Sequence, residues 1–130
     1  MRILWILVFL LAASSLAADR DLAGGYSGEW KSTASGNGGT VRFVLENEGG
    51  AWKGTAAFTL DGTEVPCTMR TVKVQDGKIE LVYEFDAQGT LLRSTQKGEW
   101  KDMEFRGSYS TATADGQSID QGTWSAKRKA

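Results

Sequence analysis

Hydrophobic and polar side chains alternate along most of the chain beyond residue 25. The clearest example is Lys78–Phe85, whose apolar residues fall on one side of an extended chain and whose mainly charged residues fall on the other. Aromatic and branched aliphatic residues on one face of a period-two pattern are typical of a half-buried β-strand. The segment therefore predicts a strand with one face in a core and the other face in water.

The same pattern recurs in weaker form between Gly-containing turns such as Asp61-Gly62. Strands are expected at Tyr26–Ala34, Thr40–Glu46, Ala51–Leu60, Glu64–Gln75, Lys78–Phe85, Leu91–Trp100, Met103–Thr113 and Ser118–Lys127. Short strands at such regular spacing indicate a barrel or a sandwich. An even number of strands in a simple meander leaves the first and last antiparallel, so they can pair and remove both sheet edges. We therefore expect an all-β fold, an eight-stranded antiparallel up-and-down barrel of the calycin type, with a two-sheet β-sandwich as the alternative.

Two of the expected strands change parity. In the fourth, the apolar side changes between Met69 and Val72, which indicates a β-bulge near Arg70-Thr71. In the last, Ile119 and Trp124 fall on opposite sides. That strand is therefore expected to be bulged or to expose one of these two residues.

The N-terminus has the pattern of a secretory signal peptide. One positive charge at Arg2 precedes the uncharged apolar segment Ile3–Ala13, which is shorter than the roughly 20 residues that span a bilayer. Small residues at Ser15 and Ala17 predict cleavage after Ala17, although cleavage one residue later is also compatible, and an uncleaved membrane helix is the alternative. We expect a signal peptide over residues 1–17, a polar lead-in over residues 18–25 and a single barrel domain over residues 26–130. The protein is then exported, periplasmic or extracellular, with no stable membrane anchor after cleavage.

Composition excludes several kinds of chemistry. The chain has no histidine, which removes the commonest general base, the Ser-His-Asp triad and the commonest metal ligand. A net charge of −1 argues against nucleic acid as a partner. The sole cysteine, Cys67, has no partner for an intramolecular disulfide and is expected to be an inert buried thiol. No cofactor, metal site or catalytic residue is assigned, and an enzyme that uses Tyr, Glu or Asp as acid or base is the least favoured hypothesis.

A Gly-x-Trp triplet occurs three times, at Gly28–Trp30, Gly98–Trp100 and Gly122–Trp124. Its structural interpretation is that glycine lets an aromatic side chain lie over the backbone; its functional interpretation is a duplicated ligand-binding motif. With the meander of short strands, the first triplet resembles the lipocalin and avidin-type barrels. The segment Gly98–Gly107 and the ending Trp124–Arg128 resemble small secreted bacterial domains. The lipocalin resemblance implies an apolar ligand inside the barrel, whereas the polar residues by which avidins hold biotin are not recognisable.

Small residues share the inward parity with large aromatic ones, which favours a cavity in the barrel. Aromatic residues would line it, and hydroxyl and amide groups would orient a ligand. The candidate ligand-binding residues are Trp30, Phe43, Trp52, Tyr83, Ser94, Gln96, Trp100 and Tyr109. The leading hypothesis is thus a binding module for a small, mainly apolar ligand. The alternative is that small and large side chains interdigitate in a filled barrel that acts through its outer surface. The oligomeric state is not indicated.

Overall fold

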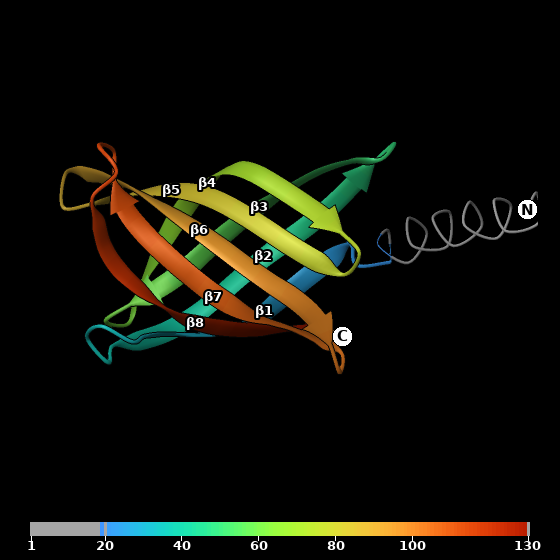
Figure 1. Cartoon of the computed structure of the whole chain (residues 1–130), viewed down its shortest axis with the longest axis horizontal. Helices are drawn as coiled ribbons and strands as arrows, with labels where there is room; N and C mark the ends of the chain where they lie inside the picture. The colour runs from blue at the N-terminus through green and yellow to red at the C-terminus, as the bar shows by residue number, and fades with distance from the viewer. Residues whose placement is uncertain (1–18, 20, 130) are drawn as a thin grey trace, which may run out of the picture.

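Eight antiparallel strands form a closed barrel in the computed structural model, which describes Asp19 and residues 21–129 (Figure 1). The strands are β1 (Gly24–Ser32), β2 (Gly38–Glu48), β3 (Ala51–Leu60), β4 (Thr63–Gln75), β5 (Lys78–Ala87), β6 (Thr90–Lys101), β7 (Glu104–Thr113) and β8 (Ser118–Arg128). The predicted up-and-down barrel is confirmed. The expected signal peptide, residues 1–17, lies outside the described residues. Within the described part of the chain, no helix is long and apolar enough to cross a membrane.

The barrel closes between β1 and β8, which pair from Tyr26↔Arg128 to Ser32↔Gly122. This pairing removes the free edges that a flat meander of strands would leave. One end, on the left in Figure 1, carries the β1–β2, β3–β4, β5–β6 and β7–β8 turns, and we call it the open end. The other end carries the remaining turns together with the start of β1 and the end of β8, and we call it the closed end.

Three turns follow the Gly-containing pairs that the sequence indicates. Asp61-Gly62, Asp76-Gly77 and Gln88-Gly89 each have two residues with positive φ, between 51° and 85°. Two consecutive left-handed residues define the type I′ turn, whose twist matches that of the flanking strands. The short-range turn chemistry therefore sets the register of these hairpins.

The β6–β7 turn lies one residue later than expected. It is formed by Asp102-Met103, with φ of 54° and 68°, because β6 continues through Lys101 and pairs there with Glu104. The prediction that Met103 begins the strand is wrong, since β7 begins at Glu104 and Met103 lies in the turn, where it is 69% exposed. A non-glycine residue in this conformation is sterically strained.

Both predicted irregularities are present. The β4–β5 register shifts between Met69 and Thr71, which confirms the bulge. The β7–β8 register shifts between two consecutive pairs, Thr111↔Asp120 and Ala112↔Ser118. Ile119 lies between the two β8 residues and is therefore the extra residue of the bulge. Ile119 is also 48% exposed, so this strand is both bulged and exposes its isoleucine.

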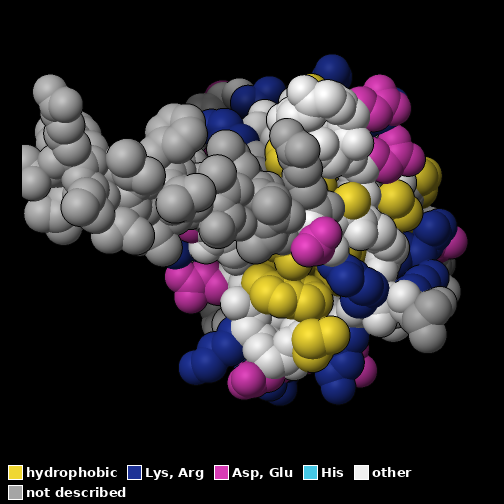
Figure 2. Space-filling view, turned by 90° about the vertical axis from the view of Figure 1, so that its right-hand side faces the viewer, with side chains coloured by type: hydrophobic (Ala, Val, Ile, Leu, Met, Phe, Trp, Pro, Cys, Tyr) yellow, Lys and Arg dark blue, Asp and Glu magenta, His cyan; other side chains and the backbone are white. Residues whose placement is uncertain are grey.

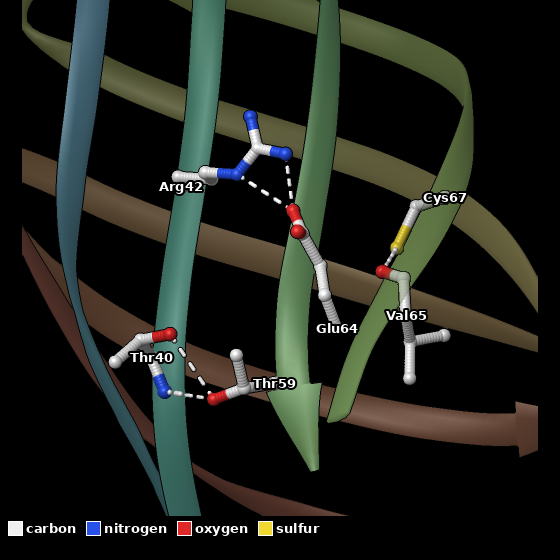
Figure 3. Close-up of polar contacts among 6 residues, drawn as sticks. All are labelled: Thr40, Arg42, Thr59, Glu64, Val65 and Cys67. Atoms are coloured by element: carbon white, nitrogen blue, oxygen red, sulfur yellow. Dashed lines mark hydrogen bonds and ion pairs between the residues drawn. The ribbon is translucent and has the colours of Figure 1, made fainter. Parts of the chain in front are cut away.

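Polar side chains cross the outer face of β2, β3 and β4 (Figure 3). The Nε of Arg42 on β2 donates to Oε1 of Glu64 on β4 at 2.8 Å, reaching across β3. The backbone N–H of Thr40 donates to Oγ1 of Thr59 at 2.8 Å. Exposed ion pairs of this kind contribute about 0–1 kcal/mol, so these contacts add little to the stability of the barrel.

The closed end is filled by stacked aromatic side chains. Tyr26, which is fully buried, lies 5.1 Å from Phe43 and 5.0 Å from Phe105 between ring centroids, and Trp100 meets its edge at 6.0 Å. Such aromatic pairs contribute about 0.5–1.5 kcal/mol each beyond the burial of their surface. The guanidinium of Arg128 covers the cluster, 5.6 Å from the Tyr26 centroid. Tyr26, Phe43 and Phe105 therefore form a packed aromatic core in this half of the barrel.

The segment before β1 seals the same end. The carboxylate of Asp19 accepts hydrogen bonds of 2.9 Å from the backbone N–H groups of Asp76 and Gly77 in the β4–β5 turn. Leu22 is buried, and its carbonyl accepts the Tyr26 hydroxyl at 2.6 Å. On the part of this face that is not covered by grey atoms, hydrophobic side chains lie beside Lys and Arg side chains (Figure 2). The residues expected to form a polar lead-in thus include side chains that pack on the barrel.

Two inward-facing glycines allow close approach in the wall. A Cβ on Gly98 would lie 2.7 Å from Cζ2 of Trp124, and one on Gly107 would lie 1.7 Å from the carbonyl oxygen of Lys97. Neither position has room for a side chain. At Gly98 this agrees with the structural interpretation of the Gly-x-Trp triplets, since the tryptophan of one triplet lies over the glycine of another.

Candidate ligand-binding cavity

A cavity of about 190 Å³ occupies the open end of the barrel. Its wall contains five aromatic residues: Trp30, Phe58, Tyr83, Phe85 and Tyr109. Leu60, Leu92 and Ile119 lie around it near the turns, and Ser94, Gln96 and Thr111 supply hydroxyl and amide groups deeper in the barrel. An aromatic core around Tyr26 therefore occupies one end of the barrel, and an open space lined by aromatic side chains lies at the other.

The aromatic wall is held together by ring contacts and by one hydrogen bond to the backbone. Trp30 meets Phe58 and Tyr109 edge to face, with centroids 6.1 and 6.0 Å apart, and Phe58 lies 4.8 Å from Phe85. The indole N–H of Trp30 donates to the carbonyl oxygen of Thr59 at 3.0 Å. Each ring is thus oriented by its neighbours, so the wall is preformed rather than assembled around a ligand.

The floor of the cavity is a connected polar network. The side-chain amide of Gln96 donates to the Tyr83 hydroxyl at 2.9 Å and to the Ser94 hydroxyl at 2.8 Å. The Thr111 hydroxyl donates to Ser94 Oγ at 3.1 Å. Burial raises the pKa of Tyr83 well above its ordinary value, so its phenol is neutral at physiological pH. Among the described residues, every fully buried side-chain nitrogen and oxygen has a hydrogen-bond partner, so this floor does not require polar groups from a ligand.

One carboxylate faces the cavity from β8. Asp120 accepts a hydrogen bond of 2.6 Å from the Ser32 hydroxyl and another of 2.9 Å from the Tyr109 hydroxyl. Burial and the neighbouring Asp120 raise the pKa of Tyr109, because both disfavour the phenolate. Of the described side chains that line the cavity, Asp120 is the one that carries a charge. It joins β1, β7 and β8 beside the cavity.

Five of the eight residues predicted to bind ligand line this cavity. These are Trp30, Tyr83, Ser94, Gln96 and Tyr109. The structure does not bring the other three to it, because they lie towards the closed end. Phe43 and Trp100 pack on Tyr26, and Trp52 pairs with Asn47 beside the β2–β3 turn.

Sequence reasoning missed Phe58, Phe85 and Asp120 as lining residues. Parity places all three inside the barrel but does not say at which height they lie. Asp120 had a usable signal, since it shares the parity of Trp124 four residues further along β8. Its distance from the nearest turn would then have placed it near the open end.

The thiol of Cys67 lies outside the cavity. Burial raises the pKa of the Cys67 thiol to about 12, so it remains protonated, and its Sγ lies 3.7 Å from the carbonyl oxygen of Val65 (Figure 3). Cys67 is half-buried and does not line the cavity. Within the described residues, no group of three or more His, Cys, Asp or Glu side chains is arranged to hold a metal ion.

Neither a protein-family model nor a curated protein matches this chain. The resemblance to lipocalin and avidin-type barrels consequently remains an expectation from the sequence.

Proposed function

We propose that this protein is an exported β-barrel that binds one small, mainly apolar ligand in the cavity at its open end. The observation that carries the proposal is the uneven filling of the interior. Aromatic residues pack tightly around Tyr26 at the closed end, yet about 190 Å³ stays open between the aromatic residues of the other half. A close-packed protein has few voids larger than a water molecule, so a space of this size is a feature of the fold.

The volume limits the size of the ligand. An engineered apolar cavity of about 150 Å³ binds benzene, whereas pockets for drug-sized ligands measure about 300–1,000 Å³. The cavity at the open end therefore suits a ligand built on a single ring or a short branched chain. Export is supported by the apolar segment Ile3–Ala13 and by the small residues that follow it.

The alternative is a structural barrel that acts through its outer surface. The dense packing around Tyr26 is compatible with that role, but it does not account for the opening at the other end. The two functions predict different responses to a substitution that occupies the cavity.

The test uses benzyl alcohol as a single-ring probe and replaces a valine on each face of β2. Val41 is buried and lines the cavity, whereas Val44 faces outwards and is 38% exposed. Benzyl alcohol should raise the melting temperature of the wild type and of Val44→Phe as its concentration passes the dissociation constant. It should also change tryptophan emission, because Trp30 lines the cavity. Val41→Phe should remain folded and should lose both responses.

Two results would refute the proposal. One is the absence of any response in the wild type to benzyl alcohol or to related single-ring compounds. The other is an equal response in the wild type and in Val41→Phe, which would place the binding site elsewhere.

A further inference from the structure

The placement of Asp120 gives the cavity a chemical preference. Its carboxylate lies in a wall that is otherwise built from aromatic, aliphatic and neutral polar side chains. It accepts hydrogen bonds from the hydroxyl groups of Ser32 and Tyr109. A carboxylate has about four lone-pair sites, so two donors leave capacity for a further one.

Two aromatic rings of the cavity wall lie beside this carboxylate. Trp30 and Tyr109 lie edge to face, with centroids 6.0 Å apart, next to the carboxylate that Tyr109 contacts. The face of an aromatic ring attracts a cation, and tryptophan does so most strongly. No lysine or arginine is among the described residues that line the cavity, so nothing in its wall opposes a positive charge.

The turns around the mouth of the cavity carry negative charge, as Asp120 does inside it. The open-end turns, residues 33–37, 61–62, 88–89 and 114–117, contain Asp61 and Asp115 and no Lys or Arg. The opposite end carries both signs, with Asp76 and Asp102 in its turns and the basic sequence Lys127-Arg128-Lys129 at the end of β8. A cleft bordered by one sign of charge concentrates ligands of the opposite sign and speeds their association.

We propose that the cavity selects a small organic cation with an ammonium group and a body the size of one aromatic ring. The ammonium group of this ligand contacts the carboxylate of Asp120. This inference rests on the proposed function and adds the chemical class of the ligand to it. The ring of the ligand lies among Phe58, Phe85 and the other aromatic residues of the wall, and its ammonium group lies on the side of Ser32 and Tyr109. A carboxylate on the same ring is disfavoured because it would face Asp120.

The experiment compares three probes that share one ring and differ in charge: benzylamine, benzyl alcohol and benzoate. Calorimetric titration at neutral pH and low salt gives their dissociation constants. The wild type should bind benzylamine about tenfold more tightly than benzyl alcohol, since hydrogen bonds to charged groups are the stronger ones, and benzoate most weakly. Asp120→Asn should remove the preference for the amine while benzyl alcohol still binds. The matched control is Asp102→Asn in an exposed turn at the closed end, which should keep the preference.

Two further measurements keep the inference testable if Asp120→Asn unfolds the junction of β1, β7 and β8. Asp120→Glu retains the charge and should retain the preference for benzylamine. In the wild type, raising the salt concentration from about 0.01 M to about 1 M should weaken the binding of benzylamine and leave that of benzyl alcohol nearly unchanged.

The possible failures are distinguishable. If the wild type binds benzyl alcohol and benzylamine equally, or if Asp120→Asn keeps the amine preference, the inference about charge is overturned and the proposed ligand-binding function stands. If none of the three probes binds, the proposed function fails together with the inference.

Discussion

The polar floor of the cavity should behave as one coupled unit, and a double-mutant cycle on Gln96 and Tyr83 tests this. Gln96 is 5% exposed, and its amide donates to both Tyr83 Oη and Ser94 Oγ. Gln96→Leu replaces it with a side chain of similar size and removes both hydrogen bonds. Tyr83→Phe removes one acceptor and leaves the amide of Gln96 short of a partner.

The magnitude follows from the number of hydrogen bonds. Each contributes about 0.5–1.5 kcal/mol net, so Gln96→Leu should lower the free energy of unfolding by about 1–3 kcal/mol. Tyr83→Phe should cost about 1–3 kcal/mol because a buried donor is left unsatisfied. The double variant should cost less than the sum of the two, with a coupling energy of at least about 0.5 kcal/mol.

The assay is urea unfolding followed by tryptophan fluorescence, with the midpoint changing and the slope unchanged. Gln121→Leu, the same substitution at an exposed position of β8, is the control and should change stability by less than about 0.5 kcal/mol. If the cost of the double variant equals the sum of the two single costs within about 0.3 kcal/mol, these side chains do not form one network.

Three further predictions follow from other parts of the chain. The pKa of Glu84 is lowered in the folded protein, mainly by a hydrogen bond from Arg70. As the pH falls, Glu84 is therefore protonated at a higher pH in the unfolded chain than in the folded protein. Stability should therefore decline below the ordinary glutamate pKa of about 4.3, and more steeply in the wild type than in Glu84→Gln; parallel pH curves would contradict this. Met103→Gly should raise the free energy of unfolding by about 0.5–1 kcal/mol. Glycine adopts the left-handed backbone conformation without the steric cost that methionine has there, although the greater freedom of glycine in the unfolded chain offsets part of this gain. A destabilised variant would show that the turn is not strained. Protein recovered from the periplasm or medium should begin at Ala18 or Asp19 in N-terminal sequencing, and a chain intact from its first residue in that fraction would refute cleavage.

Local chemistry made the fold predictable from the sequence. The alternation in Lys78–Phe85 and the Asp-Gly turns set the strands, and the change of parity after Met69 located a bulge. The β6–β7 turn was misplaced because Asp102-Met103 contains no glycine, although both residues adopt positive φ. The periodicity of the sequence does not indicate a strained turn whose position is determined by the strands on either side.

The candidate site was only partly predictable, for a geometrical reason. Period-two patterns separate inside from outside, and Trp30, Tyr83 and Gln96 were placed inside on that basis. They do not give the height of a residue along the barrel axis, which depends on the stagger between strands. Phe43 and Trp100 have the correct parity, yet they pack on Tyr26 at the closed end. Where the filled part ends and the cavity begins became visible only with the register of the closed barrel.

The most direct test of the central claim is an NMR titration of the isotope-labelled protein with benzyl alcohol, in which each amide reports its own surroundings. The account predicts saturable shift changes at Ser94, Gln96 and Thr111 in the cavity floor. The signals of Phe43 and Trp100 at the closed end should stay in place. Shifts that are absent at saturating probe, or that centre on the outer face of the barrel, would contradict a ligand site in the open end.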